Sequence, residues 1–207
     1  NWGLQTQGMV LSSFAVGYIL LQVVGGRLAD RYGGKIVLGI GVLVWSLFTI
    51  LAPPAAALGL TLLIMTRILM GMGEAVTFPS FYSLYGKWIP LNERSRAVGF
   101  ANSAIPLGTS FALIISPIII QQLGWEWVFY VFGFMGFIWY AFWHRMVTSD
   151  PRTHPKITAE ELSHIQKAIE ADEQASDIPW THFLKYKAVW AIACLLYTSP
   201  SPRDTPQ

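Results

Sequence analysis

Charged residues are scarce in this chain of 207 residues, where Lys, Arg, Asp and Glu together supply only 13% of the sequence. In a soluble domain, about a quarter of all residues are normally charged. The deficit is concentrated in three segments that contain no charge at all, residues 1–26, 36–66 and 97–125. Each is longer than the roughly 20 apolar residues that a helix needs to cross a bilayer. This pattern argues against a soluble helical domain, whose helices would show polar faces, and predicts an integral membrane protein.

Cysteine and catalytic groupings are equally scarce. Cys194 is the only cysteine, which excludes an intrachain disulfide and a metal site built from several cysteines. The four histidines have neither the spacing of metal ligands nor a nucleophile beside them, and no phosphate-binding glycine loop is present. The basic residues flank apolar segments and do not form one surface for nucleic acid. We therefore expect no enzyme activity, no bound metal, no cofactor and no nucleic-acid partner.

The apolar segments predict five complete membrane spans in a transmembrane part that covers residues 1–146. The predicted spans are residues 7–25, 36–52, 58–84, 97–120 and 127–146. The second is expected to break at Pro53-Pro54, because proline removes a helix hydrogen bond. A further span is expected to start at 188–194, and residues 195–207, with two closely spaced prolines, are interpreted as a non-native tail.

Lys and Arg alternate between the two sides of these spans. They follow the first, third and fifth spans and are absent from the turns after the second and fourth. The positive-inside rule then places the basic turns in the cytoplasm. The first residues therefore lie outside, which predicts one more helix before residue 1 in a complete protein, and no signal peptide is visible. We expect a multi-pass protein of the cell or bacterial inner membrane, with an organelle membrane as the alternative.

The segment from 147 to 187 is predicted to be a cytoplasmic loop with a short amphipathic helix. Thr158 and Glu161 have the spacing of a capping box. Leu162, Ile165 and Ile169 then fall on one helical face. A solvated linker without a helix is the equally open alternative.

Two ionisable residues, Arg67 and Glu74, lie inside the third predicted span. A charge in the membrane is costly and is by default a hypothesis of function. Two helical turns separate the pair, so both side chains point to nearly the same face, about 10 Å apart along the axis. Because they are too far apart for a close ion pair, each must face water, a ligand or another helix. We predict a hydrated path along this face, and the alternative is that both residues only bridge neighbouring helices.

A compact basic turn, residues 26–35, joins the first two spans and reads Gly-Arg-Leu-Ala-Asp-Arg-Tyr-Gly-Gly-Lys. This turn resembles the signature between helices two and three of the major facilitator superfamily. Four further stretches, 67–79, 88–96, 124–133 and 154–161, resemble the anion:cation symporter branch of that family. This branch includes carriers of phosphate, sialate, glutamate and sugar acids. The resemblance covers about residues 7–193.

The resemblance implies an all-α membrane fold, with helices two to six of a twelve-helix carrier followed by its central loop. It implies that Arg67 binds the substrate and that Glu74 couples proton movement. A guanidinium suits two-pronged recognition of an anion, and a poorly hydrated carboxyl suits proton exchange. The intact protein is then expected to be a monomeric secondary transporter that moves H⁺ or Na⁺ together with a small anion across the bilayer. Inorganic phosphate and organic or sugar-acid carboxylates are the expected substrates, bound near the midplane.

Two further groups of residues are assigned roles on this basis. The path is expected to be lined in addition by Tyr18, Phe78, Asn102 and Ser103. The two charged turns are predicted to form a cytoplasmic latch that opens and closes during transport, although plain topology marking would also explain the basic residues. The residues assigned to this latch are Gly26, Asp30, Arg31, Gly33, Lys35, Glu93, Arg94 and Arg96.

Three alternatives to the symporter remain. The first is a proton-coupled drug or solute exporter of the same superfamily, although residues 104–108 lack the Gly-Pro-x-x-Gly-Gly run that resembles such exporters. The second is a membrane sensor that does not transport. The third is an inactive fragment.

Overall fold

The computed structural model describes residues 3–175 together with 186, 190, 191 and 194. Within these residues the elements are helical and no strand is present, which confirms the predicted all-α class. They are α1 Leu4–Tyr32, α2 Gly34–Leu58, α3 Leu60–Ala75, α4 Thr77–Trp88, α5 Leu91–Leu123, α6 Glu126–Met146, the 3-10 turn η1 Pro151–Thr153 and α7 Ala159–Ala175. The predicted helix start at 188–194 lies largely outside the described residues, and the predicted tail 195–207 lies wholly outside them.

Within the described residues, four helical stretches are long and apolar enough to cross a membrane. They are α1, α2, the combined α3 and α4, and α5. The predicted spans fall within these helices and α6, apart from short connections. Helix α6 has 21 residues and packs along α2, but it is not among the four. Its role as a fifth span therefore stays a prediction.

The predicted break at Pro53-Pro54 is wrong, because α2 continues through both prolines to Leu58. Proline has a helical φ, so its cost in a helix is a lost donor and local crowding. Ala52 and Pro53 are buried, and Ala52 packs with Val10 and Leu63 in one apolar cluster. Tertiary packing of the last turn therefore offsets the proline penalty, and the helix ends at Gly59, where φ is +144°.

Helices α1 and α3 approach each other closely through glycines. A Cβ atom on Gly17 would overlap the carbonyl oxygen of Ile68, and one on Gly71 would overlap the carbonyl oxygen of Phe14. Small residues at such crossings allow backbone contact between membrane helices. The contact fixes α1 against the part of α3 that lies between Arg67 and Glu74.

This close contact predicts opposite effects for two matched substitutions in the intact protein. Gly71→Ala should lower stability by about 1–3 kcal/mol, because the added methyl group overpacks a backbone contact. Gly86→Ala in α4, where a Cβ would meet nothing within 4 Å, should raise stability by up to about 1 kcal/mol through helix propensity. Thermal unfolding of the purified protein in detergent measures both, and equal stabilisation by the two variants would contradict the contact.

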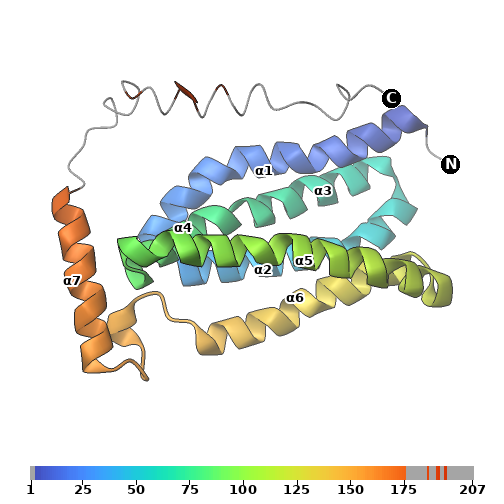
Figure 1. The fold of residues 1–207 in the computed structure, drawn as a ribbon. Coiled ribbons are helices and arrows are strands. Elements are labelled where there is room, and N and C mark those ends of the chain that lie inside the picture. The colour runs from blue at the N-terminus through green and yellow to red at the C-terminus, as the bar shows by residue number, and fades with distance from the viewer. Residues whose placement is uncertain (1–2, 176–185, 187–189, 192–193, 195–207) are drawn as a thin grey trace, which may run out of the picture.

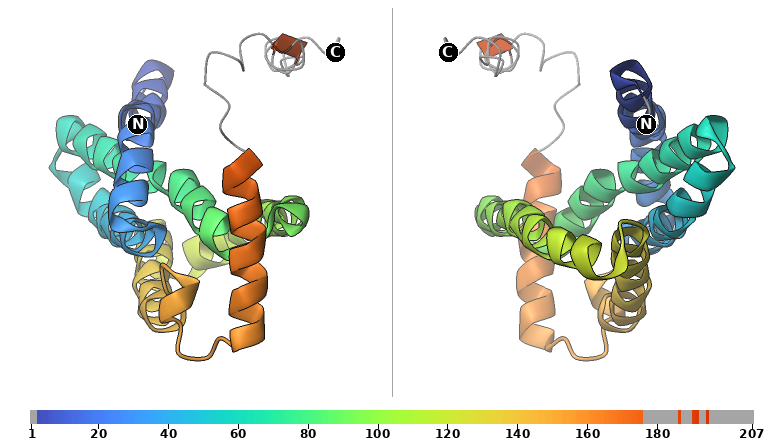
Figure 2. Two further views of the ribbon diagram at one scale, coloured as in Figure 1. Left: turned by 90° about the vertical axis from the view of Figure 1, so that its left-hand side faces the viewer. Right: turned by 90° about the vertical axis from the view of Figure 1, so that its right-hand side faces the viewer.

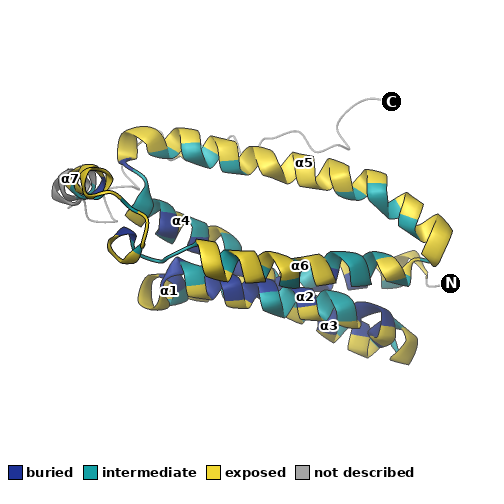
Figure 3. Ribbon diagram, turned by 90° about the horizontal axis from the view of Figure 1, so that it is seen from below, coloured by how far each residue is buried: buried dark blue, intermediate teal, exposed yellow. Residues whose placement is uncertain are grey.

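The helices α1 to α6 run side by side, and α7 crosses one end of the group (Figure 1). Viewed along the helices, α5 lies on the opposite side from α3 (Figure 2). No residue of α5 is buried, and its surface is mostly exposed along its length (Figure 3). The end crossed by α7 carries the turn from α1 to α2 and the end of α4, with Arg27, Arg31, Lys35 and Lys87. We call this the basic end.

The segment that follows α6 is attached to the basic end by specific contacts. The Trp88 indole donates a hydrogen bond to the Thr148 carbonyl at 3.1 Å. The Thr158 hydroxyl oxygen accepts from the Glu161 backbone N–H at 3.3 Å at the start of α7. Leu162, Ile165 and Ile169 face the end of α4 across a shared cavity. An amphipathic helix therefore lies on the basic end.

Candidate functional site

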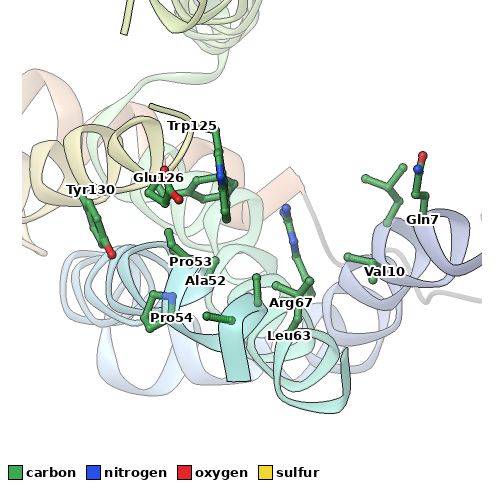
Figure 4. A pocket seen from close by; sticks show the side chains of 14 residues that line it. Gln7, Val10, Ala52, Pro53, Pro54, Leu63, Arg67, Trp125, Glu126 and Tyr130 are labelled. Carbon is green, nitrogen blue, oxygen red and sulfur yellow. The ribbon is translucent and has the colours of Figure 1, made fainter. Parts of the chain in front are cut away.

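Arg67 borders a cavity of about 910 Å³ at the end of the molecule opposite the basic end. The cavity is lined by Gln7, Val10 and Leu11 of α1, by Ala52, Pro53, Pro54, Ala56 and Ala57 of α2, by Leu63 and Arg67 of α3, and by Trp125, Glu126, Phe129 and Tyr130. Arg67 points into it between Val10 on one side and Trp125 on the other (Figure 4). Among the lining residues Arg67 carries the one permanent positive charge.

The guanidinium of Arg67 has an aromatic neighbour and, among the described residues, no carboxylate partner. Its Cζ atom lies 5.9 Å from the centroid of the Phe129 ring, a contact that favours a cation. Its Nε atom is buried without a hydrogen-bond partner. Within the described part of the chain Arg67 forms no ion pair, although Glu126 lines the same cavity. The charge is therefore available to an anion that enters.

Glu74 lines a second cavity of about 310 Å³ between α1, α3, α4 and α5. Tyr18, Phe78 and Asn102, all predicted path residues, line the same cavity. Thr77 also contributes to it, and its hydroxyl oxygen is buried without a hydrogen-bond partner. The structure thus brings four of the predicted path residues together around one space.

The helix that carries Glu74 is interrupted directly after it. Helix α3 ends at Ala75, and α4 begins at Thr77. Pro79 explains the interruption, because it has no N–H to donate to the Ala75 carbonyl. The regular pattern resumes where the Ser80 N–H donates to the Val76 carbonyl at 3.0 Å. Glu74 therefore lies at a discontinuity, where irregular backbone is tolerated next to a cavity in a membrane protein.

The two cavities lie one after the other along the seam between α1 and α3. The combined span runs for 29 residues from Leu60 to Trp88, so Glu74 lies at its centre. Arg67 lies two turns, or about 10 Å, nearer the end opposite the basic end. Phe14, whose backbone contacts Gly71 between these levels, stacks its ring on Tyr18 with centroids 6.1 Å apart. Arg67 and Glu74 thus face separate spaces, and Tyr18 of this aromatic pair lines the one that contains Glu74.

The comparisons with known proteins agree with this architecture. The profile of the Major Facilitator Superfamily matches residues 1–200. The chain belongs to this superfamily. The xylose transporter XylE from E. coli, in an inward-open conformation, shares the fold with a TM-score of 0.67 and 15% identity, over 84% of this chain and 47% of the other.

Two curated relatives carry more sequence similarity. The chloroplastic ascorbate transporter of Arabidopsis thaliana is 42% identical over 93% of this chain and 36% of its own length. The chloroplastic sodium-dependent phosphate transport protein 1 of Arabidopsis thaliana is 42% identical over 93% of this chain and 38% of its own length. The chain therefore spans a little over a third of these relatives. It is a multi-pass membrane chain of the superfamily, and its relatives include anion transporters.

The remaining predicted residues do not join the two cavities. The Ser103 hydroxyl donates to the Phe100 carbonyl at 2.6 Å on exposed α5 and lines neither space. In the signature turn of the superfamily, Gly33 ends α1 with φ +89°. Gly34 is buried against Ser80 and Leu84 of α4. The absence of a side chain at Gly34 thus allows the backbone of the turn to pack closely against α4.

The latch residues form a looser group. Asp30, Arg31, Glu93 and Arg96 form no ion pair in the part of the chain that the structure describes. The Arg31 guanidinium lies 5.5 Å from the centroid of the Tyr32 ring, and the Arg94 Nη2 atom donates to the Ile89 carbonyl at 3.4 Å. The latch therefore stays a prediction about another conformation.

Asp30→Asn in the intact protein tests the latch. If Asp30 forms an ion pair in only one state of the cycle, its loss should change the initial uptake rate by up to about five-fold, because an exposed ion pair contributes about 0–1 kcal/mol. Uptake rates at equal protein abundance are the measurement. An unchanged rate would favour topology marking as the role of this turn.

The sequence predicts no role for several residues that line the two cavities. These residues are Phe129 and Trp125 beside Arg67, and Tyr82 and Tyr85 beside Glu74. For Phe129 and Trp125, the available signal was the resemblance of residues 124–133 to the anion:cation symporter branch. That resemblance did not indicate that these residues lie beside Arg67. Spacing alone cannot place α6 next to α3, because that contact depends on how distant helices pack.

Proposed function

We propose that the intact protein is a secondary active transporter that couples H⁺ or Na⁺ to the movement of a small anion. Arg67 carries this proposal, since its guanidinium is half-buried, lines a cavity and forms no ion pair with a carboxylate in the part of the chain that the structure describes. A buried cation without a permanent partner is costly. That cost is offset when a carboxylate or phosphate binds, because a guanidinium forms two parallel charge-assisted hydrogen bonds with either.

The chemical class of the substrate follows from the composition of the cavity. Within the described residues, its lining is mostly apolar, with Gln7 and Tyr130 as uncharged polar groups, Arg67 as the cation and Glu126 as a carboxylate that forms no ion pair with Arg67. Such a site favours one negative group at the guanidinium and a polar or ring-shaped remainder against Trp125 and Phe129. The names of the relatives, one an ascorbate and one a phosphate transporter, support a small oxyanion.

Glu74 is proposed as the coupling residue. It lies at the centre of the span, at a helix discontinuity, beside the hydroxyl and amide groups of Thr77, Tyr18 and Asn102. A carboxyl in such a place can alternate between a protonated and an ionised state as its hydration changes. A carried cation is driven inward by the membrane potential with about 2.3 kcal/mol per charge per 100 mV. More than one cation per anion therefore makes the entry of the anion favourable.

Uptake by the full-length protein in proteoliposomes tests this proposal. Labelled phosphate, ascorbate and glucuronate are offered with an inward pH gradient, an inward Na⁺ gradient or none, and glucose serves as the neutral control. We expect at least one anion to accumulate above protein-free vesicles under one gradient, and no accumulation of glucose. Anion accumulation that occurs only while the cation leaves the vesicle would favour an exporter. The absence of transport under any gradient would favour a sensor.

A further inference from the structure

A third cavity, of about 470 Å³, lies at the basic end of the molecule, where α2 begins and α6 ends. It shares no lining residue with the cavities of Arg67 and Glu74. Its lining consists of Lys35, Ile36 and Ile40 from α2, Tyr140, Trp143 and His144 from α6, and Thr148, Ser149 and Thr153 from the segment that follows. None of these side chains is assigned to substrate binding or proton coupling, although Lys35 also belongs to the predicted latch.

The position of these groups is fixed by contacts between distant segments. The Trp143 indole donates a hydrogen bond to the Lys35 carbonyl at 3.0 Å, which joins α6 to the first turn of α2. A Cβ on Gly39 would lie 2.9 Å from the Tyr140 ring, so the absent side chain allows this ring to approach α2. A Cβ on Gly33 would likewise lie 2.9 Å from the Ser149 hydroxyl oxygen. The cavity is therefore built into the helix packing.

The lining combines the chemistry of a phosphate site with that of a lipid-facing surface. Lys35 supplies a positive charge, His144 supplies a ring N–H, and four lining residues carry hydroxyl groups, whereas none of the lining residues is acidic. Ile36 and Ile40 lie one turn apart on α2 and are 52% and 55% exposed. Trp143 stacks on Trp139 with ring centroids 4.8 Å apart, and tryptophan is enriched at membrane interfaces.

We propose that this cavity binds the headgroup of an anionic phospholipid. The phosphodiester lies between Lys35 and His144, with the Ser149 hydroxyl as a further donor, because the Thr148 and Thr153 hydroxyl groups already donate to the Asp150 carbonyl at 3.4 and 2.9 Å. An acyl chain follows Ile36 and Ile40 along the outer face of α2. Basic pockets between membrane helices on the cytoplasmic side bind anionic headgroups in this way.

The apolar part of the cavity favours a lipid over a dissolved anion. A free phosphate ion gains nothing from the exposed isoleucines, and its attraction to Lys35 is screened by salt within about 8 Å. A lipid anion is confined to the surface where Lys35 and His144 lie, so its local concentration is high. The same basic residues that orient the chain place this cavity in the leaflet where anionic lipids are abundant.

Native mass spectrometry of the delipidated full-length protein tests the proposal with phosphatidylglycerol and phosphatidylcholine as probes. Phosphatidylglycerol should bind about five-fold more tightly for each basic residue engaged. Lys35→Gln combined with His144→Gln should bring its affinity to that of phosphatidylcholine. Lys35→Arg should retain the preference. Arg145→Gln is the matched control, because Arg145 is exposed beside His144 but does not line the cavity, and it should leave the preference unchanged.

Three results would overturn the proposal. The first is equal binding of the two lipids to the unmodified protein, and the second is a preserved preference in the double variant. The third is displacement of phosphatidylglycerol by millimolar glycerol phosphate, which would show that a dissolved anion occupies the cavity. If the double variant does not fold, a photoactivatable phosphatidylglycerol on the unmodified protein decides, since crosslinks within 35–40 or 140–153 support the site and crosslinks only elsewhere reject it.

Discussion

Arg67→Ala should reduce anion uptake by the intact protein by roughly 100-fold or more, since removal of one partner from a buried charge pair costs about 3–5 kcal/mol. The guanidinium is the one permanent cation that lines its cavity, and Phe129 and Leu63 offer the substrate no replacement. The loss should appear for every anion that the protein carries, because the charge recognises the feature that these substrates share. Initial uptake of the accumulated anion, corrected for protein abundance in the membrane, is the measurement.

Arg67→Lys separates charge from geometry at the same position. Lysine keeps the positive charge but presents a point charge in place of a planar fork. Its uptake should fall by about ten-fold, which corresponds to about 1.4 kcal/mol, the contribution of one hydrogen bond to a charged group. Equal activity of the lysine and wild-type proteins would show that two-pronged recognition is not used.

The matched control for both variants is Arg145→Gln, which removes an exposed cation outside this cavity. It should retain uptake within about two-fold, because an exposed charge contributes less than about 1 kcal/mol. Uptake of anions by the alanine variant at the wild-type rate would remove Arg67 from the binding site. A monodisperse profile in size-exclusion chromatography shows whether any loss comes from misfolding.

Much of the fold could be predicted from the sequence because the physics of membrane spans is local. Charge-free segments of sufficient length and basic turns on alternate sides indicate where helices run. The prediction failed at Pro53-Pro54, where helix packing decides and local propensity does not. Burial of Ala52 and Pro53 beside Val10 retains the helix, and no local pattern reports that contact.

The roles of Arg67 and Glu74 stay predictions. Their separation by two turns predicts nearly the same face of the helix, but it could not show that they line different cavities. Between the two levels, Gly71 lets the backbone of α1 approach α3 so closely that a Cβ would overlap the Phe14 carbonyl oxygen, and residue spacing does not report that contact. The substrate is expected to bind near the midplane, at the level of Glu74, whereas Arg67 lies about 10 Å nearer one end. Under the proposed function, an anion that enters from that end would meet the guanidinium before it reaches the level of the carboxyl.

Glu74→Gln should remove the response of anion accumulation to a pH gradient in the intact protein. Glutamine has nearly the same shape as glutamic acid and can occupy the cavity with Tyr18 and Asn102, but it cannot exchange a proton. In the wild-type protein, one pH unit is worth about 1.4 kcal/mol per coupled proton and can raise accumulation up to about ten-fold. In the variant, accumulation should be the same with and without the gradient.

Counterflow distinguishes lost coupling from lost transport in the same variant. Exchange of labelled for unlabelled anion needs no net proton movement, so Glu74→Gln should retain it, whereas Arg67→Ala should lose it together with uptake. Glu160→Gln, which removes an exposed carboxylate on α7, is the matched control and should keep both exchange and the pH response. A pH response that survives in Glu74→Gln would assign the coupling proton to another group. If Glu74→Gln loses only the response of uptake to an Na⁺ gradient, the Glu74 carboxylate binds Na⁺, because the amide no longer supplies the negative charge.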